Sequence, residues 1–181
     1  MWEGQLTNRQ IDNILYQAES LPFMDAVIGT GDSSAQTDYR RSRVKWLNNE
    51  GDIRDLLFHY VSEANRTAFN VNVTNYAQIQ YTEYLAENKG HYGWHHDIFW
   101  QGESGETQNM DRKLSIVVQL SDHDCYEGGN FSFKEVDSPD LSFKSKGSIL
   151  VFPSYLTHKV EPVTFGRRLS LVAWFYGPRW S

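Results

Sequence analysis

The sequence predicts a mainly β fold, a jelly roll with N-terminal helices packed on one of its sheets. Two segments before Asn70 have helical periodicity, whereas apolar residues after it alternate as they do in strands. Clusters of glycine, aspartate or proline separate most of the strand-like segments. Two helices followed by about seven or eight short strands are typical of two packed sheets with helices on one face. We expect one domain over residues 1–181, in which residues 1–69 support a β core formed by 70–181.

Each predicted helix has an amphipathic pattern and a start signal. The first lies within residues 7–21, and Thr7 with Gln10 fits a capping box. Its apolar stripe is expected to be Ile11, Ile14, Leu15 and Ala18. The second lies within residues 51–66, with Asp52 as the predicted N-cap. Its buried stripe is expected to be Ile53, Leu56, Leu57, Tyr60 and Val61.

The strands are predicted from alternation and from the turn residues between them. A polar, glycine-bearing loop over 29–43 leads into RVKWL, residues 43–47, which is a short strand by composition. A second polar loop is expected over 101–111. The other predicted strands are 71–84, 92–99, 112–120, 129–135, 147–152, 156–163 and 167–176.

Composition and charge narrow the function classes. Of the 181 residues, 40% are hydrophobic and 22% are charged, as in a soluble globular protein. The formal net charge of −6 argues against a nucleic-acid backbone or an anionic membrane as partner. Cys125 is the only cysteine, which fits a reducing, cytoplasmic compartment. The sequence shows no signal-peptide pattern and no apolar run long enough to span a bilayer, so we expect neither a signal peptide nor a transmembrane segment. The sequence does not indicate an oligomeric state.

The segment GWHHDIFW, residues 93–100, contains two potential metal ligands. Alternate side chains of a strand share a face, so His95 and Asp97 are expected together and His96 on the other side. Taken alone, this triplet is weak evidence for a metal site, and a surface histidine beside a loop aspartate is the more common explanation. His158, at the start of a distant predicted strand, is the best third ligand. Two histidines and one carboxylate form the facial triad of non-haem Fe(II) oxygenases. The remaining histidines are expected to face solvent: His59, His91 and His123.

Two predicted strands have one polar face each. In the last strand one face carries Arg168, Ser170, Val172 and Trp174. If that face lines the interior, the buried guanidinium of Arg168 needs an anionic partner. A carboxylate that Arg168 binds with two hydrogen bonds is the natural partner, and the Ser170 hydroxyl could donate a third. A solvent-facing arginine at a strand end is the alternative. In the first long strand the polar face carries Gln78, Gln80, Thr82 and Tyr84.

Several spaced segments resemble a known family. They are IQYTEY, HYGWHHD, KLSIVVQLSD, YEGGNFSF and KGSILVFPSYLTHKVEPVTFGRRLSLVAWF, which together span roughly residues 75–176. They resemble the 2-oxoglutarate- and Fe(II)-dependent oxygenases, and more narrowly the prolyl-4-hydroxylase-like, PKHD-type group. The resemblance implies a double-stranded β-helix with the metal ligands His95, Asp97 and His158. It also implies that Arg168 holds the distal carboxylate of 2-oxoglutarate and that Tyr84 contacts this cosubstrate.

The resemblance implies a dioxygenase that uses Fe(II), 2-oxoglutarate and O2, with L-ascorbate as a further cofactor. Substrate hydroxylation would release succinate and CO2. The nearest relatives suggest a proline in a peptide or protein as substrate, as in procollagen-proline 4-dioxygenases. Two alternatives remain: the same chemistry on a small molecule or another side chain, and a non-catalytic jelly-roll binding or structural module.

Substrate contacts are expected from loops and exposed aromatic residues. The loops 28–45 and 101–111 are hypothesised to close over substrate, and plain surface loops are the alternative. The first of these stretches contributes the arginines Arg40, Arg41 and Arg43. The residues predicted to contact substrate are Trp100, Trp46, Tyr92 and Arg43.

Overall fold

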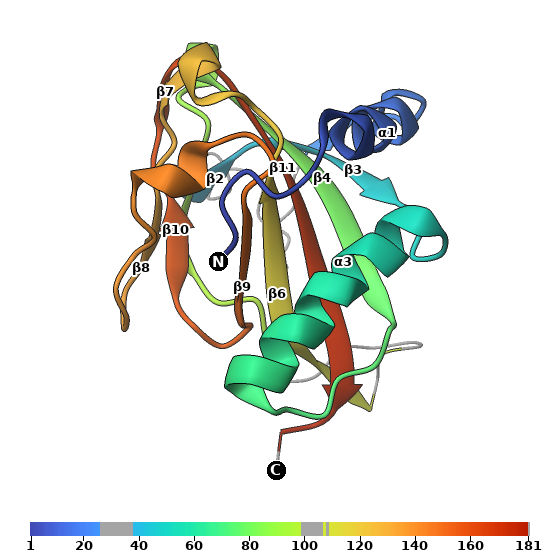
Figure 1. The fold of residues 1–181 in the computed structure, drawn as a ribbon. Helices are drawn as coiled ribbons and strands as arrows, with labels where there is room; N and C mark the ends of the chain where they lie inside the picture. Colours follow the sequence, from blue (N-terminus) through green and yellow to red (C-terminus); the bar gives the residue numbers. More distant parts are fainter. Residues whose placement is uncertain (26–37, 99–106, 108, 181) are drawn as a thin grey trace.

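In a computed structural model, the chain forms two antiparallel sheets with helices on the outer face of the larger one (Figure 1). The structure describes residues 1–25, 38–98, 107 and 109–180. Within these residues, no helix is long and apolar enough to cross a bilayer. The arrangement confirms the mainly β fold with supporting N-terminal helices.

The helices begin close to where their sequences predict. Helix α1 (Asn8–Glu19) has the predicted capping box, in which the Gln10 N–H donates to Thr7 and the Thr7 N–H donates to Gln10. Helix α3 (Asp52–Ala64) continues as a π-helical turn over Asn65–Phe69. Its N-cap is Gly51 rather than the predicted Asp52. The Asp52 carboxylate instead accepts hydrogen bonds from Asn13 and Gln17 of α1, so it joins the two helices.

The larger sheet carries the core of the fold. Its strand order is β1-β3-β4-β11-β6-β9, and β7 pairs with the extended β11. The smaller sheet has the order β2-β5-β10-β8. The larger sheet comprises β1 (Met24–Asp25), β3 (Arg43–Leu47), β4 (Ala77–Leu85), β6 (Met110–Gln119), β7 (Tyr126–Gly128), β9 (Ile149–Pro153) and β11 (Val163–Pro178). The smaller comprises β2 (Arg40–Arg41), β5 (His91–His95), β8 (Phe131–Phe133) and β10 (His158–Val160). Short 3₁₀ helices span Ala86–Asn88, His123–Cys125 and Leu141–Lys144.

Three predicted strands differ from the structure for local reasons. The strand predicted from residue 71 begins at Ala77, because the Asn65 side chain takes both backbone groups of Val71. The strand predicted over 129–135 is shortened to β8, and the separate strand β7 precedes it, because the chain turns at Gly128 and Gly129, both at positive φ. The strand predicted over 92–99 ends at His95.

Alternation along β11 separates the core from the interior of the barrel. Leu169, Leu171, Ala173 and Phe175 belong to the apolar core between the larger sheet and the helices. The opposite face carries Arg168, Ser170, Val172 and Trp174, which line a cavity between the sheets. In this register Arg168 lies beside Tyr84 of β4 and Ser170 beside Thr82, so the polar faces of both strands meet. The predicted facing of both strands is confirmed.

Candidate metal centre and cosubstrate pocket

A cavity between the two sheets collects polar side chains from distant parts of the chain. Strands β4, β6 and β11 of the larger sheet and β2, β5, β8 and β10 of the smaller one contribute to its lining. The cavity contains His95, Asp97, His158 and Arg168 together. The structure thus brings together the four residues that carry the predicted site.

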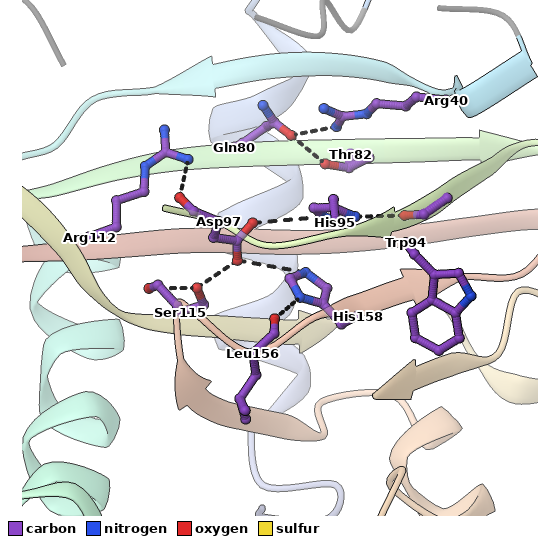
Figure 2. Close-up of polar contacts among 12 residues, drawn as sticks. Arg40, Gln80, Thr82, Trp94, His95, Asp97, Arg112, Ser115, Leu156 and His158 are labelled. Carbon is purple, nitrogen blue, oxygen red and sulfur yellow. Dashed lines mark hydrogen bonds and ion pairs between the residues drawn. The ribbon is translucent and has the colours of Figure 1, made fainter. Parts of the chain in front are cut away.

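The three potential metal ligands converge on one point (Figure 2). His95 Nε2 lies 3.7 Å from Asp97 Oδ1, and His158 Nε2 lies 3.7 Å from Asp97 Oδ2. The two histidines face each other across the pairing of β5 with β10, with ring centroids 4.2 Å apart. His96, which lies between His95 and Asp97 in the sequence, is exposed, as predicted. Two imidazole nitrogens and one carboxylate oxygen are a donor set that fits Fe(II).

Backbone carbonyls set the orientation of both imidazoles. His95 Nδ1 lies 2.8 Å from the Gly93 carbonyl oxygen, and His158 Nδ1 lies 2.9 Å from that of Leu156 (Figure 2). A carbonyl oxygen only accepts, so in the neutral form of each ring the hydrogen is on Nδ1 and Nε2 keeps its lone pair. Both lone pairs then belong to the nitrogens that lie beside Asp97.

Burial and mutual charge set the protonation of the cluster. Burial, followed by the neighbouring His158, lowers the pKa of His95 to about 3. Burial favours the neutral form of Asp97, but His158, His95 and the hydrogen bond from Ser115 together hold its pKa below the ordinary value. Near neutral pH the cluster therefore holds a neutral His95 and an ionised Asp97, the forms that bind a metal.

Asp97 is held by contacts that the sequence did not reveal. It lies after the end of β5, where its N–H donates to the Ser154 carbonyl at 2.9 Å. Ser115 Oγ donates to Asp97 Oδ2 at 2.6 Å, and Arg112 Nη1 donates to the Asp97 carbonyl at 3.2 Å (Figure 2). A lone serine within the apolar run of β6 is a sequence signal for Ser115. Arg112 had no such signal, because its partners come from other strands.

Aromatic rings pack against both imidazoles. Tyr92 stacks on His95 with centroids 3.4 Å apart, and Phe131 stacks on His158 at 5.3 Å. Burial raises the pKa of the Tyr92 hydroxyl to about 12. These contacts fix the planes of the two imidazoles and cover one side of the cluster.

Arg168 is a buried cation at another level of the cavity. It is 2% exposed, and its guanidinium lies 5.5 Å from the centre of the Tyr84 ring. Gly129, at a φ of 58°, passes so close that a Cβ there would lie 2.9 Å from Arg168 Cδ. Among residues that the structure describes, no carboxylate is within ion-pair distance of this guanidinium. A buried guanidinium without an acid partner fits an anionic ligand.

The residues predicted to contact substrate lie in different places. Tyr92 lines the cavity. Trp46 is 42% exposed and lies 6.0 Å from the ring of Trp174, a lining residue. Arg43 does not line the cavity, and its guanidinium pairs with the buried Glu83 carboxylate, so its substrate contact stays a prediction. Trp100 lies outside the described residues, as do 26–37 and most of the loop predicted over 101–111.

Comparisons with known proteins agree with this geometry. A family model described as the 2OG-Fe(II) oxygenase superfamily matches residues 79–176. A PKHD-type hydroxylase of Crocosphaera subtropica is 37% identical over 91 residues, which are 50% of this chain and 39% of that protein. One from a Janthinobacterium species is 32% identical over 88 residues, 49% of this chain and again 39% of that protein. The chain therefore matches well under half of the length of these relatives.

Two solved structures share the fold over nearly the whole chain. A Pseudomonas putida prolyl-4-hydroxylase has a TM-score of 0.63 at 19% identity, covering 98% of this chain and 91% of that one. A prolyl hydroxylase from Trichoplax adhaerens, in complex with a peptide fragment of the hypoxia inducible factor oxygen degradation domain, has a TM-score of 0.65 at 18% identity. It covers 93% of this chain and 76% of that one.

The superfamily implies Fe(II), 2-oxoglutarate and O2 as cofactor and cosubstrates, and the donor set in the cavity fits them. The family model covers more than half of the 181 residues and includes all four residues of the predicted site. This chain belongs to the 2OG-Fe(II) oxygenase superfamily.

Proposed function

We propose that this protein is an Fe(II)- and 2-oxoglutarate-dependent dioxygenase that hydroxylates a proline in a peptide or protein. One observation carries the proposal: two imidazole nitrogens, a carboxylate and a buried arginine that meets no acid among the described residues share one cavity. A non-catalytic module has no evident use for a buried cation without an acid partner, since its desolvation costs stability.

Fe(II) would be held by His95 Nε2, His158 Nε2 and an oxygen of Asp97. Ser115 already donates to Asp97 Oδ2, which leaves Oδ1 as the less committed oxygen. When bound, Fe(II) and 2-oxoglutarate supply O2 activation, so that one oxygen atom enters a substrate C–H bond and succinate and CO2 are released. Near neutral pH, His95 Nε2 can bind a metal without first releasing a proton, because burial lowers the pKa of His95 to about 3.

Arg168 would hold the distal carboxylate of 2-oxoglutarate. Its fork of N–H donors matches a carboxylate bidentately, and burial strengthens that contact. Ser170 lies on the same face of β11 and is 1% exposed, so its hydroxyl is a further donor toward that anion. The Tyr84 ring lies beside the guanidinium and limits the ways in which a ligand is held.

The prolyl substrate is supported by relatives and by aromatic residues at the site. Two similar folds are prolyl hydroxylases, one of them in complex with a peptide. The half-exposed Trp46 offers a ring against which a proline packs. The fixed φ of proline makes an extended ligand that loses little entropy on binding. A small molecule or another side chain under the same chemistry is the alternative.

The test is anaerobic loading with Fe(II) and 2-oxoglutarate, then exposure to O2 with a library of proline peptides. Succinate formation matched by a peptide mass gain of one oxygen atom supports the full proposal. Succinate coupled to a non-peptide substrate rejects the prolyl assignment and keeps the oxygenase. No succinate with any substrate, from protein that binds Fe(II), rejects the catalytic function. Trp100→Ala is expected to lose coupled peptide hydroxylation and to keep slow uncoupled succinate formation.

A further inference from the structure

A second arginine, Arg40 of β2, lines the same cavity. Its Nη2 donates to Gln80 Oε1 at 2.9 Å (Figure 2), and its Nε donates to Ser42 Oγ at 2.9 Å. Its guanidinium carbon lies 4.3 Å from the centre of the Tyr92 ring, the ring that stacks on His95. Three contacts from three segments therefore hold this guanidinium in a fixed place beside the metal site.

None of these contacts neutralises the charge of Arg40. An amide oxygen, a hydroxyl and an aromatic ring orient a guanidinium, but none carries a formal negative charge. Within the described ranges, no acid lies in ion-pair distance of Arg40, although the neighbouring Arg41 pairs with Asp38 and Arg43 with Glu83. The Arg40 N–H groups that these acceptors do not use remain for a ligand.

The 2-oxoglutarate proposed for Arg168 does not account for Arg40. The partner of Arg40, Gln80, pairs in register with Val172, four residues along β11 from Arg168. Four strand residues correspond to roughly 13 Å. The two guanidinium groups are thus anchored at different levels of the cavity, and Arg40 is on the side of the metal ligands.

The charges of the loaded site lead to the same conclusion. Counting only the charged groups that line the cavity, Fe(II) and Arg168 would carry three positive charges, which balance Asp97 and the two carboxylates of 2-oxoglutarate; Arg112, which donates to the Asp97 carbonyl, lies outside the lining. Arg40 is then one positive charge in excess, partly buried beside Tyr92. A partly desolvated cation in an otherwise balanced site favours one further anion.

We propose that Arg40 binds a carboxylate of the substrate that is oxidised, so that the enzyme prefers substrates with an acidic group close to the target carbon. This rests on the proposed function, because it assumes a second organic substrate beside 2-oxoglutarate. The carboxylate belongs either to an acidic residue next to the target in a peptide or to a small-molecule acid. Its recognition by the Arg40 fork is the same in both.

The experiment compares acid and amide probes that otherwise match. The small probes are N-acetylproline and N-acetylprolinamide. The peptide probes have Asp or Asn directly before or directly after a central proline. Binding is measured by calorimetry, without O2, on protein loaded with Fe(II) and 2-oxoglutarate. We expect at least one acid probe to bind about 10- to 100-fold more tightly than its amide, the effect of a charged hydrogen bond.

Variants assign the preference to Arg40. Arg40→Gln is expected to bring the acid-to-amide ratio close to one and to leave 2-oxoglutarate affinity unchanged, which also shows that it folds. Arg40→Lys should keep part of the preference for the acid probe, because lysine keeps the positive charge but lacks the paired N–H donors of the guanidinium. Arg41→Gln is the matched control on the same strand. Arg41 donates to the Asn88 carbonyl and does not line the cavity, so this variant should keep the full ratio.

Each other outcome has a defined meaning. Equal binding of acid and amide by the wild type, or no saturable binding of any acid probe, overturns the proposal. So does an acid preference that persists in Arg40→Gln, or a loss of 2-oxoglutarate binding in that variant. Preference limited to the peptide pairs or to the small pair identifies the source of the carboxylate. An intact preference without succinate formation under O2 rejects the oxygenase function and leaves the carboxylate site standing.

Discussion

Ser115→Ala tests whether the metal site depends on a hydroxyl that itself binds no metal. Ser115 is fully buried, and its Oγ lies 2.6 Å from Oδ2 of Asp97, which is 6% exposed. A hydrogen bond to a charged group contributes about 1.5–3 kcal/mol. Removing the partner of a metal ligand typically costs about 10- to 100-fold in metal affinity. The two ranges agree, so we expect Fe(II) affinity to fall by about 10- to 100-fold.

The assay is an anaerobic Fe(II) titration against a competing chelator. 2-Oxoglutarate is left out, so that the measured Fe(II) affinity reflects the protein ligands alone. Ser148→Ala is the matched control, because Ser148 is also fully buried and its hydroxyl has two partners, the Gly4 N–H and the Ser142 carbonyl, away from the cavity. It should lower stability without changing metal affinity. Ser154→Ala should have a smaller effect than Ser115→Ala, because Ser154 Oγ contacts Ser115 Oγ at 2.9 Å.

The reasoning would be refuted by a Ser115→Ala protein that binds Fe(II) within about twofold of wild type, a difference well below the expected loss. It would also be refuted if Ser148→Ala weakened metal binding as much, since the effect would then be one of general stability. In either case the short hydrogen bond to Asp97 does not set the strength of the metal site.

Three further predictions address the same cavity. His95→Ala should abolish Fe(II) binding, whereas His96→Ala should retain most of it, since His96 is exposed; the reverse order would contradict the facing observed. Arg168→Ala should weaken 2-oxoglutarate binding by on the order of 2–5 kcal/mol and leave Fe(II) affinity unchanged. Arg167→Ala, at the mostly exposed neighbouring residue, should change 2-oxoglutarate binding little. Equal 2-oxoglutarate titration curves for Arg168→Ala and wild type would reject the role of Arg168 in holding 2-oxoglutarate. The pKa of His95 is about 3 in the folded protein against an ordinary 6.5, so between these values the unfolded chain binds more protons. The free energy of unfolding of the metal-free protein should therefore fall as pH drops below 6.5, by up to about 1.4 kcal/mol per pH unit. Denaturant titrations should give a flatter pH dependence for His95→Gln than for wild type, and identical dependences would exclude this explanation.

Predictions from alternation succeeded where a long strand has two chemically different faces. Along β11 a slip of one residue would exchange Arg168 and Ser170 for Leu169 and Leu171, so burial strongly determines the register. The same argument placed His95 on the inner face, but it did not reveal that the strand ends there. Asp97 joins His95 because its N–H bonds to the Ser154 carbonyl, a partner far away in the sequence.

The surroundings of Arg43 also depend on the tertiary structure, and its substrate contact stays a prediction. Its exposed, basic surroundings in the sequence suggested a substrate contact, yet it meets Glu83 on the neighbouring strand β4. Arg40 lies in the same basic stretch, and its hydrogen-bond partners among the described residues are neutral acceptors. Residue type and local pattern are alike for the two arginines, and only strand pairing separates an ion-paired side chain from an unpaired one in the cavity.

The sequence alone determined the fold class, the family and the residue types of the site. These depend on local patterns: the period of apolar residues, the turn residues, and the spacing of histidine, aspartate and arginine within segments. Only the tertiary structure decided how those residues act together: that Ser115 and Arg112 hold Asp97, and that Arg40 faces the cavity with no acid of the described residues in ion-pair distance. Hydrogen bonds and ion pairs act over a few ångströms, and the residues that these contacts join are 15 to 40 positions apart in the sequence.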